Sequence, residues 1–145
     1  RSVHGEGGEV LKLMGDAILA VFPVGEDGPE DERCAAQACL QAAQRAWDEL
    51  RSDPDDVHPL RAGFGLTLGE VIYGNIGAPG RLDFTIIGDA VNLAARLEQM
   101  SKALGEDVLL GPRLAERAGA TEHALGSFRV KGFRSPIDVY GGSTR

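Results

Sequence analysis

Near the start of the chain, two short apolar segments flank a glycine–aspartate pair, and this pattern predicts a β-hairpin. The first segment covers residues 9–14 and the second residues 17–22, and Pro23 ends the second. A glycine at the first turn position suits the two-residue loops that join antiparallel strands. Gly15 and Asp16 are therefore predicted to form the tip of the hairpin.

The rest of the chain alternates predicted helices and strands without a regular strand–helix–strand repeat. Helical spacing of apolar residues predicts helices over residues 35–50, 89–103 and 112–118. Asp89 is predicted to cap the second helix at its N-terminus. Apolar and β-branched runs predict strand structure over residues 60–76, 82–87, 108–110, 127–130 and 137–140. The longest of these runs predicts either one long strand or two strands bent at Gly69 and Gly74.

Hairpins mixed with helices favour an α+β fold over a doubly wound parallel sheet. We expect a mostly antiparallel sheet with helices packed on one face. The 145 residues suffice to bury one core, and the sequence contains no internal repeat and no low-complexity linker. Residues 1–145 are therefore predicted to form a single domain.

The charge and the cysteines narrow the range of partners and locations. The net charge of −7 argues against a nucleic-acid partner, because such binding depends on clustered Lys and Arg. The longest uncharged apolar stretch, residues 17–24, is too short to span a bilayer, so we expect no membrane contact by this domain. Cys34 and Cys39 lie on different faces of a predicted helix, which disfavours a disulfide and indicates a reducing, cytoplasmic setting.

Lys12 and Asp16 are polar residues in the apolar hairpin, and each has two interpretations. Lys12 either extends its ammonium group to water at a sheet edge or faces a ligand cleft. Asp16 is either an ordinary turn residue or a metal ligand. Four residues along a strand cover about 13 Å. If both residues are functional, they serve different parts of a large ligand or different sites.

Asn92 and Arg96 are spaced by four residues on a predicted helix and therefore share one face. Together with Gln99 they form the exposed stripe of a half-buried helix, or they bind a ligand. An amide and a guanidinium one turn apart suit a sugar and its phosphate. The sequence contains no Walker-type phosphate loop and no recognisable serine–histidine nucleophile motif.

Two long motifs resemble the class III nucleotidyl cyclases. Residues 7–23, GGEVLKLMGDAILAVFP, resemble the hairpin of that family, and residues 81–98, RLDFTIIGDAVNLAARLE, resemble the strand and helix at its catalytic face. Residues 69–77 resemble the stretch between these motifs, and residues 130–133 resemble the usual ending. The resemblance extends over nearly the whole chain and implies a ferredoxin-like α+β fold.

The resemblance implies that two residues recognise the purine base. Lys12 matches the base-recognising lysine, and Thr85 matches the second base-reading position. Threonine at that position is similar to the subgroup called class IIIb, some of whose members respond to bicarbonate. Guanylate-forming members commonly have Glu and Cys at these two positions. The pair in this chain therefore favours ATP as the substrate.

The resemblance also implies the reaction and the residues that perform it. Asp16 matches the second of two aspartates that hold two divalent ions, Mg²⁺ or Mn²⁺. Asn92 matches the residue that orients the ribose, and Arg96 matches the residue that stabilises the transition state. Lys131 is similar to a lysine that meets the triphosphate. The implied product is 3′,5′-cyclic AMP, formed with pyrophosphate at sites shared between the two copies of a homodimer.

One departure from the family motif leaves alternatives open. The first metal-binding aspartate of the family lies on a strand well before the matched hairpin, and this chain begins too late to include it. We therefore expect the 145-residue chain alone to be weakly active or inactive. The alternatives are a guanylate cyclase, a binding module without nucleotide chemistry, and a non-catalytic dimerising regulatory module. The joint presence of Lys12, Asp16, Asn92 and Arg96 argues against the last two.

Overall fold

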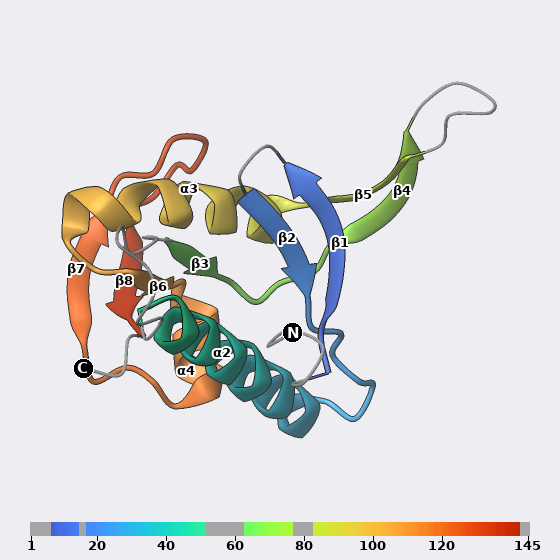
Figure 1. Ribbon diagram of the computed structural model, residues 1–145, viewed down its shortest axis with the longest axis horizontal. Helices are drawn as coiled ribbons and strands as arrows, with labels where there is room; N and C mark the ends of the chain where they lie inside the picture. The colour runs from blue at the N-terminus through green and yellow to red at the C-terminus, as the bar shows by residue number, and fades with distance from the viewer. Residues whose placement is uncertain (1–6, 15–16, 52–62, 77–82, 143–145) are drawn as a thin grey trace.

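The computed structural model describes residues 7–14, 17–51, 63–76 and 83–142 (Figure 1). The strands are β1 (Glu9–Met14), β2 (Ala17–Val21), β3 (Phe64–Leu66), β4 (Ile72–Ile76), β5 (Asp83–Ile87), β6 (Val108–Leu110), β7 (Ala124–Phe128) and β8 (Ile137–Gly141). The helices are α2 (Pro29–Arg51), α3 (Asp89–Leu104) and α4 (Pro112–Ala118). Within these residues, no helix combines the length and apolar character needed to cross a membrane.

Two antiparallel hairpins form separate two-stranded sheets. β1 pairs with β2, which confirms the predicted N-terminal hairpin, and its register shifts between Val10 and Lys12. β4 pairs with β5 in regular register from Ile72 opposite Ile87 to Ile76 opposite Asp83. Figure 1 shows that β4 and β5 project from the body of the molecule as an arm.

The remaining strands form one mixed sheet in the order β3-β6-β8-β7. β3 and β6 are parallel, whereas β6–β8 and β7–β8 are antiparallel. Most strand pairs of the described chain are therefore antiparallel, and helices pack on the sheet. The predicted α+β fold with a mostly antiparallel sheet is confirmed.

The helices cover both faces of this sheet, and here the structure corrects the expectation of helices on one face only. The consecutive β6 residues Val108, Leu109 and Leu110 are all 0% exposed. Successive strand residues point to opposite faces. Val108 and Leu110 join a core cluster with α2 and α4, whereas Leu109 joins a second cluster with α3. Figure 1 shows α3 on one side of the sheet and α2 with α4 on the other.

Several predicted boundaries shift in the structure. Residues 60–76 contain two strands, β3 and β4, which agrees with the second of the two predicted alternatives, and residues 60–62 lie outside the described chain. Gly88, not Asp89, is the N-cap of α3, because its carbonyl oxygen already accepts hydrogen bonds from the N–H groups of Val91 and Asn92. α2 begins at Pro29, within the acidic stretch of residues 26–32 that was expected to form a loop and helix start, and Glu30, Asp31 and Glu32 occupy its first turn.

Candidate active site

α3 carries two of the predicted site residues, Asn92 and Arg96. Asn92 is exposed and Arg96 is half-buried. The opposite side of the helix faces the sheet, where Leu97 and Ser101 are buried. The predicted amphipathic arrangement is therefore confirmed, and the amide and the guanidinium lie one turn apart on the side of α3 away from its buried core face.

Close backbone contacts fix α3 against β3. A Cβ atom added to Gly65 would overlap the carbonyl oxygen of Ala94 and would lie 2.7 Å from the backbone nitrogen of Glu98. The hydroxyl of Thr67 donates a hydrogen bond of 2.6 Å to the carbonyl oxygen of Ala90. These contacts hold the first turns of the helix, and therefore the backbone of Asn92, in a defined position relative to the sheet.

β5 leads directly into α3 through Gly88. A Cβ atom at Gly88 would lie 2.9 Å from the carbonyl oxygen of Glu70, so the junction passes close to the loop before β4. Thr85 lies in β5 opposite Gly74 of β4, and its side chain lies outside the described structure. Thr85 in β5 and Asn92 in α3 thus belong to one continuous strand–helix unit.

The guanidinium of Arg96 has a neutral hydrogen-bond partner. Its Nη1 donates to Oε1 of Gln99 at 3.2 Å. Arg96 forms no ion pair with any carboxylate in the described part of the chain, although Glu98 is close in sequence. From its position in the sequence, Gln99 was expected only to belong to the exposed stripe of this helix. Its spacing of three residues from Arg96 is the signal that predicts such a contact.

Lys12 lies in β1 at the register shift and is paired with Leu19 of β2. Shifts of this kind bend a strand and redirect its side chains, and they are common beside active sites. β1 contacts β5, so the strand of Lys12 runs beside the strand of Thr85. The side chain of Lys12 and all of Asp16 lie outside the described structure. In the part that is described, no three His, Cys, Asp or Glu side chains are grouped to hold a metal ion.

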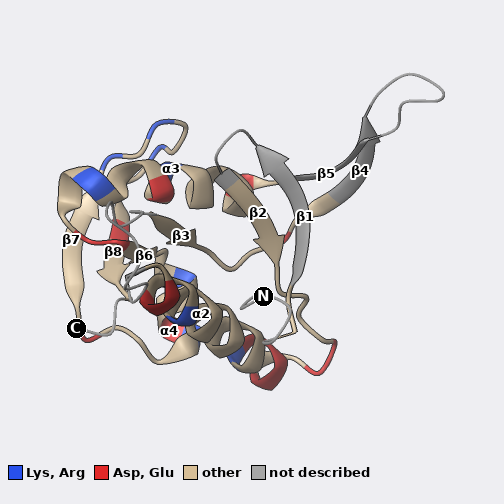
Figure 2. Ribbon diagram, viewed as in Figure 1, with Lys and Arg blue, Asp and Glu red and all other residues tan. Residues whose placement is uncertain are grey.

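Lys131 is exposed at the turn between β7 and β8. The N–H of Phe133 donates to the carbonyl oxygen of Val130 at 3.0 Å, and Gly132 has a φ of +96°. Buried Val130 anchors this turn. Figure 2 shows blue stretches of ribbon, which mark Lys and Arg, in the β7–β8 loop, whereas the protein as a whole has a net charge of −7.

The base of the β7–β8 hairpin packs against α3. Phe128 and Ile137 pair across the two strands and contact the core cluster that contains Leu97. Because the loop continues from this base, α3 and the loop with Lys131 belong to one packed unit. The structure thus links Thr85, Asn92, Arg96 and Lys131 through β5, α3 and the hairpin, and it leaves the position of Asp16 undescribed.

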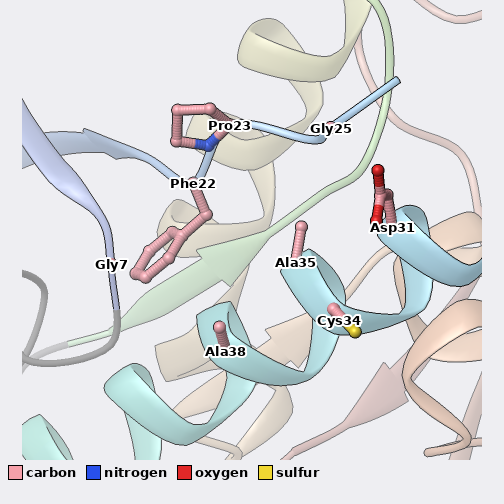
Figure 3. Close-up of a pocket in the computed structure, with 8 residues that line it drawn as sticks. All are labelled: Gly7, Phe22, Pro23, Gly25, Asp31, Cys34, Ala35 and Ala38. Carbon is pink, nitrogen blue, oxygen red and sulfur yellow. The ribbon is translucent and has the colours of Figure 1, made fainter. Parts of the chain in front are cut away.

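A cavity of about 290 Å³ lies elsewhere, between the start of β1, the β2–α2 loop and the first turns of α2 (Figure 3). Its lining includes the apolar side chains of Phe22, Pro23 and Ala35. The carboxylate of Asp31 in its wall accepts a hydrogen bond of 2.8 Å from the N–H of Asp27. Asn92, Arg96 and Lys131 are the predicted site residues whose side chains the structure describes, and none of these three lines this cavity.

The chain matches the family of adenylate and guanylate cyclase catalytic domains over residues 3–140. This match includes nearly every described element. The chain therefore belongs to the adenylate and guanylate cyclase catalytic domain family, as the two sequence motifs predicted.

Individual relatives agree with this assignment. An adenylate cyclase from Anabaena cylindrica is 31% identical over 150 residues, which cover 97% of this chain and 29% of that protein. A bacterial light-regulated adenylyl cyclase of known structure is 31% identical with a TM-score of 0.71, covering 97% of this chain and 40% of that chain. The adenylyl cyclase CyaB from P. aeruginosa is 26% identical with a TM-score of 0.75, covering 99% of this chain and 76% of that chain. The chain thus spans less than a third of the Anabaena protein.

Proposed function

We propose that the protein is an adenylate cyclase, which converts ATP into 3′,5′-cyclic AMP and pyrophosphate. The observation that carries the proposal is the placement of Asn92 and Arg96 one turn apart on α3, with the Arg96 guanidinium free of any ion pair to a described carboxylate. An unneutralised guanidinium on a helix held firmly to the sheet suits a site where negative charge develops.

In the proposed reaction, the ribose 3′-oxygen forms a bond to the α-phosphorus of ATP as the bond from that phosphorus to the bridging oxygen breaks. The 3′-hydroxyl loses its proton, and pyrophosphate departs with the bond electrons. Asn92 hydrogen-bonds the ribose and holds the 3′-oxygen in line for attack. Arg96 donates hydrogen bonds to the phosphoryl oxygens as their charge grows. Lys131 pairs with the triphosphate.

Asp16 is the residue of this chain that we propose as a metal ligand. Its carboxylate oxygens are the donors that Mg²⁺ and Mn²⁺ prefer. When bound, such divalent ions make the 3′-hydroxyl easier to deprotonate and offset the charge of the leaving oxygen. In the sequence, Asp16 lies between β1 and β2, and its placement is outside the described residues.

ATP is proposed as the substrate because of the residue types at positions 12 and 85. The Lys12 ammonium can only donate, which suits the ring-nitrogen acceptor of adenine, and the Thr85 hydroxyl can accept from the 6-amino group. The contact between β1 and β5 supports joint action of the two residues. The family itself includes both adenylate and guanylate cyclases, so this pair carries the distinction between them.

We propose a homodimer as the active form. Ile72 and Ile87 lie directly opposite each other at the base of the β4–β5 arm and are 70% and 52% exposed. Exposed apolar pairs of this kind on a projecting arm suit burial against another protein surface. A second copy would also let Lys12 and Asp16, which are four residues apart in the sequence, act on nucleotides at opposite sites.

Incubation of the purified full-length protein with ATP and Mn²⁺ tests the proposal. We expect cyclic AMP and pyrophosphate in equal amounts and much slower turnover of GTP. The Arg96→Ala variant should lose most of this activity while keeping its oligomeric state. A stable dimer that binds ATP without turnover would instead identify a regulatory module, and a higher rate with GTP would contradict the assignment of the purine.

A further inference from the structure

Gln99 is the hydrogen-bond partner that the structure gives to the Arg96 guanidinium, and the family resemblance assigns it no role. We propose that Gln99 is a positioning residue, which orients Arg96 for the developing phosphoryl charge without neutralising it. This inference rests on the proposed function, since it concerns the same transition state.

Two features of the structure restrict the orientation of the Arg96 guanidinium. The backbone of α3 is fixed by the close approach of Gly65 to Ala94, so the remaining freedom of Arg96 lies in its long side chain. The bond from Nη1 of Arg96 to Oε1 of Gln99 removes part of that freedom. A charged group that is already oriented loses less entropy when the transition state forms.

The chemistry of the acceptor matters as much as its position. An amide oxygen is neutral, so it occupies one of the five N–H donors of arginine and leaves the positive charge and the other donors for phosphate oxygens. A carboxylate at the same place would form an ion pair with Arg96 and compete with the substrate. Glu98, the residue before Gln99, does not take that place. Neither of its carboxylate oxygens pairs with Arg96 in the described structure.

Two substitutions of Gln99 that are almost the same size should therefore have different effects. Gln99→Leu removes the acceptor and frees the guanidinium. Gln99→Glu keeps the acceptor and adds a charge. A role that is only structural predicts no harm from the second change, because Gln99 is exposed and an exposed Arg–Glu pair at this spacing slightly favours a helix.

Ala103 provides matched controls. It is exposed on α3, four residues beyond Gln99 on the same face. Ala103→Leu and Ala103→Glu therefore place the same two side chains on the same face without reaching Arg96.

The experiment measures kcat and KM for ATP in the full-length protein carrying each substitution, with and without Arg96→Ala. We expect Gln99→Leu to lower kcat about tenfold with KM within about twofold of the original value, because a mispositioned group costs mainly transition-state binding. Gln99→Glu should lower kcat further, and added salt should restore part of that loss by screening the new ion pair. Both effects should disappear in the Arg96→Ala background.

A second measurement follows the side chain itself. Rotation of the Arg96 guanidinium about its Nε–Cζ bond is followed by NMR in labelled protein. It should become faster in Gln99→Leu, slower in Gln99→Glu and stay unchanged in both Ala103 variants.

Two results would overturn the proposal. One is that the Gln99 variants match the Ala103 variants in kcat and in guanidinium rotation. The other is that the loss in kcat persists in the absence of Arg96. By contrast, normal cyclic AMP formation in Arg96→Ala alone would remove the role of Arg96 in the proposed function, and the role of Gln99 with it.

Discussion

Gly65 of β3 lies directly beneath the carbonyl oxygen of Ala94 in α3, at a separation that leaves no room for a side chain. This contact lies between Asn92 and Arg96 along the helix. Although Gly65 has no functional group, its contact with Ala94 determines the position of the candidate active site relative to the sheet. Any larger residue at position 65 must push α3 outward and move both site residues.

We therefore predict that Gly65→Ala lowers the free energy of unfolding by about 2 to 3 kcal/mol, as overpacking of a close contact does. Urea denaturation measures this loss. Gly105→Ala is the control: Gly105 has a φ of +67° and open space around it, so only the backbone cost of about 1 kcal/mol applies. Equal losses in the two variants would contradict a steric role for Gly65.

Arg96→Ala should lower kcat for cyclic AMP formation by about 10²- to 10³-fold, the usual cost of losing a donor to developing charge. The thermal unfolding midpoint should change little, because Arg96 is half-buried and forms one hydrogen bond to a neighbouring surface residue. Asn92→Ala is a useful comparison, because it removes a neutral amide from the same face of α3 rather than a positive charge. Near-normal turnover in Arg96→Ala would discard the transition-state role.

Exchange of both base-reading residues should change the preferred purine. In the combined variant Lys12→Glu with Thr85→Cys, we expect the ratio of kcat/KM for ATP to that for GTP to fall by more than about tenfold, since each altered hydrogen bond to the base contributes to discrimination. Lys12→Glu alone should lose ATP turnover without gaining GTP turnover. An unchanged ratio in an active combined variant would place base recognition on other residues.

Local patterns predicted the elements that are stabilised locally. The two strands around the Gly15–Asp16 turn, the strand over residues 108–110 and the helix over residues 112–118 all form where expected. In each case a turn residue or a proline marks the boundary within the segment itself. The pairing of Asn92 with Arg96 on one face of a helix was predictable for the same reason.

The two-sided sheet was not predicted, because tertiary partners determine it. Val108, Leu109 and Leu110 form an uninterrupted apolar run, which is typical of a strand buried on both faces. In a three-residue strand that signal is too short to establish which helices cover which face. The start of β7 at Ala124 depends likewise on pairing with Tyr140 of β8, across a register shift. The spacing of Arg96 and Gln99 allows a contact between them, but a sequence pattern does not determine side-chain rotamers, so the hydrogen bond itself was found only in the structure.

Ile72→Asp should shift the protein from dimer to monomer. The substitution places a charge on the exposed apolar pair formed with Ile87, and burial of an unpaired charge opposes association. Sedimentation at several concentrations measures the change, and cyclic AMP formation should fall with the dimer fraction. Val24→Asp is the matched control, since Val24 is exposed at the β2–α2 loop, away from the arm. Dissociation caused equally by both variants would contradict an interface at Ile72.

The two cysteines should differ in reactivity because their surroundings differ. Cys34 is exposed, whereas Cys39 packs against the core cluster between α2 and α4, and burial raises the pKa of its thiol to about 12. The thiolate is the nucleophile. At pH 8, iodoacetamide should therefore modify Cys34 in the folded protein and Cys39 only after unfolding in urea, as mass spectrometry of the tryptic peptides would record. Rapid modification of Cys39 in the folded state would refute this.

Burial of the Cys39 thiol also makes the free energy of unfolding depend on pH. The direction of this dependence follows from the pKa of the thiol in the folded and the unfolded chain. The folded pKa of Cys39, about 12, lies above the ordinary thiol value of 9.0, so above pH 9 the folded chain retains a proton that the unfolded chain loses. The stabilisation is fully present below about pH 9 and is lost as the pH rises toward 12. Urea midpoints between pH 8 and pH 10.5 should therefore fall less in Cys39→Ala than in the unmodified sequence. Cys34→Ala should keep the full decline of the urea midpoint, since Cys34 is exposed. An equal decline in all three proteins would show that other groups cause it.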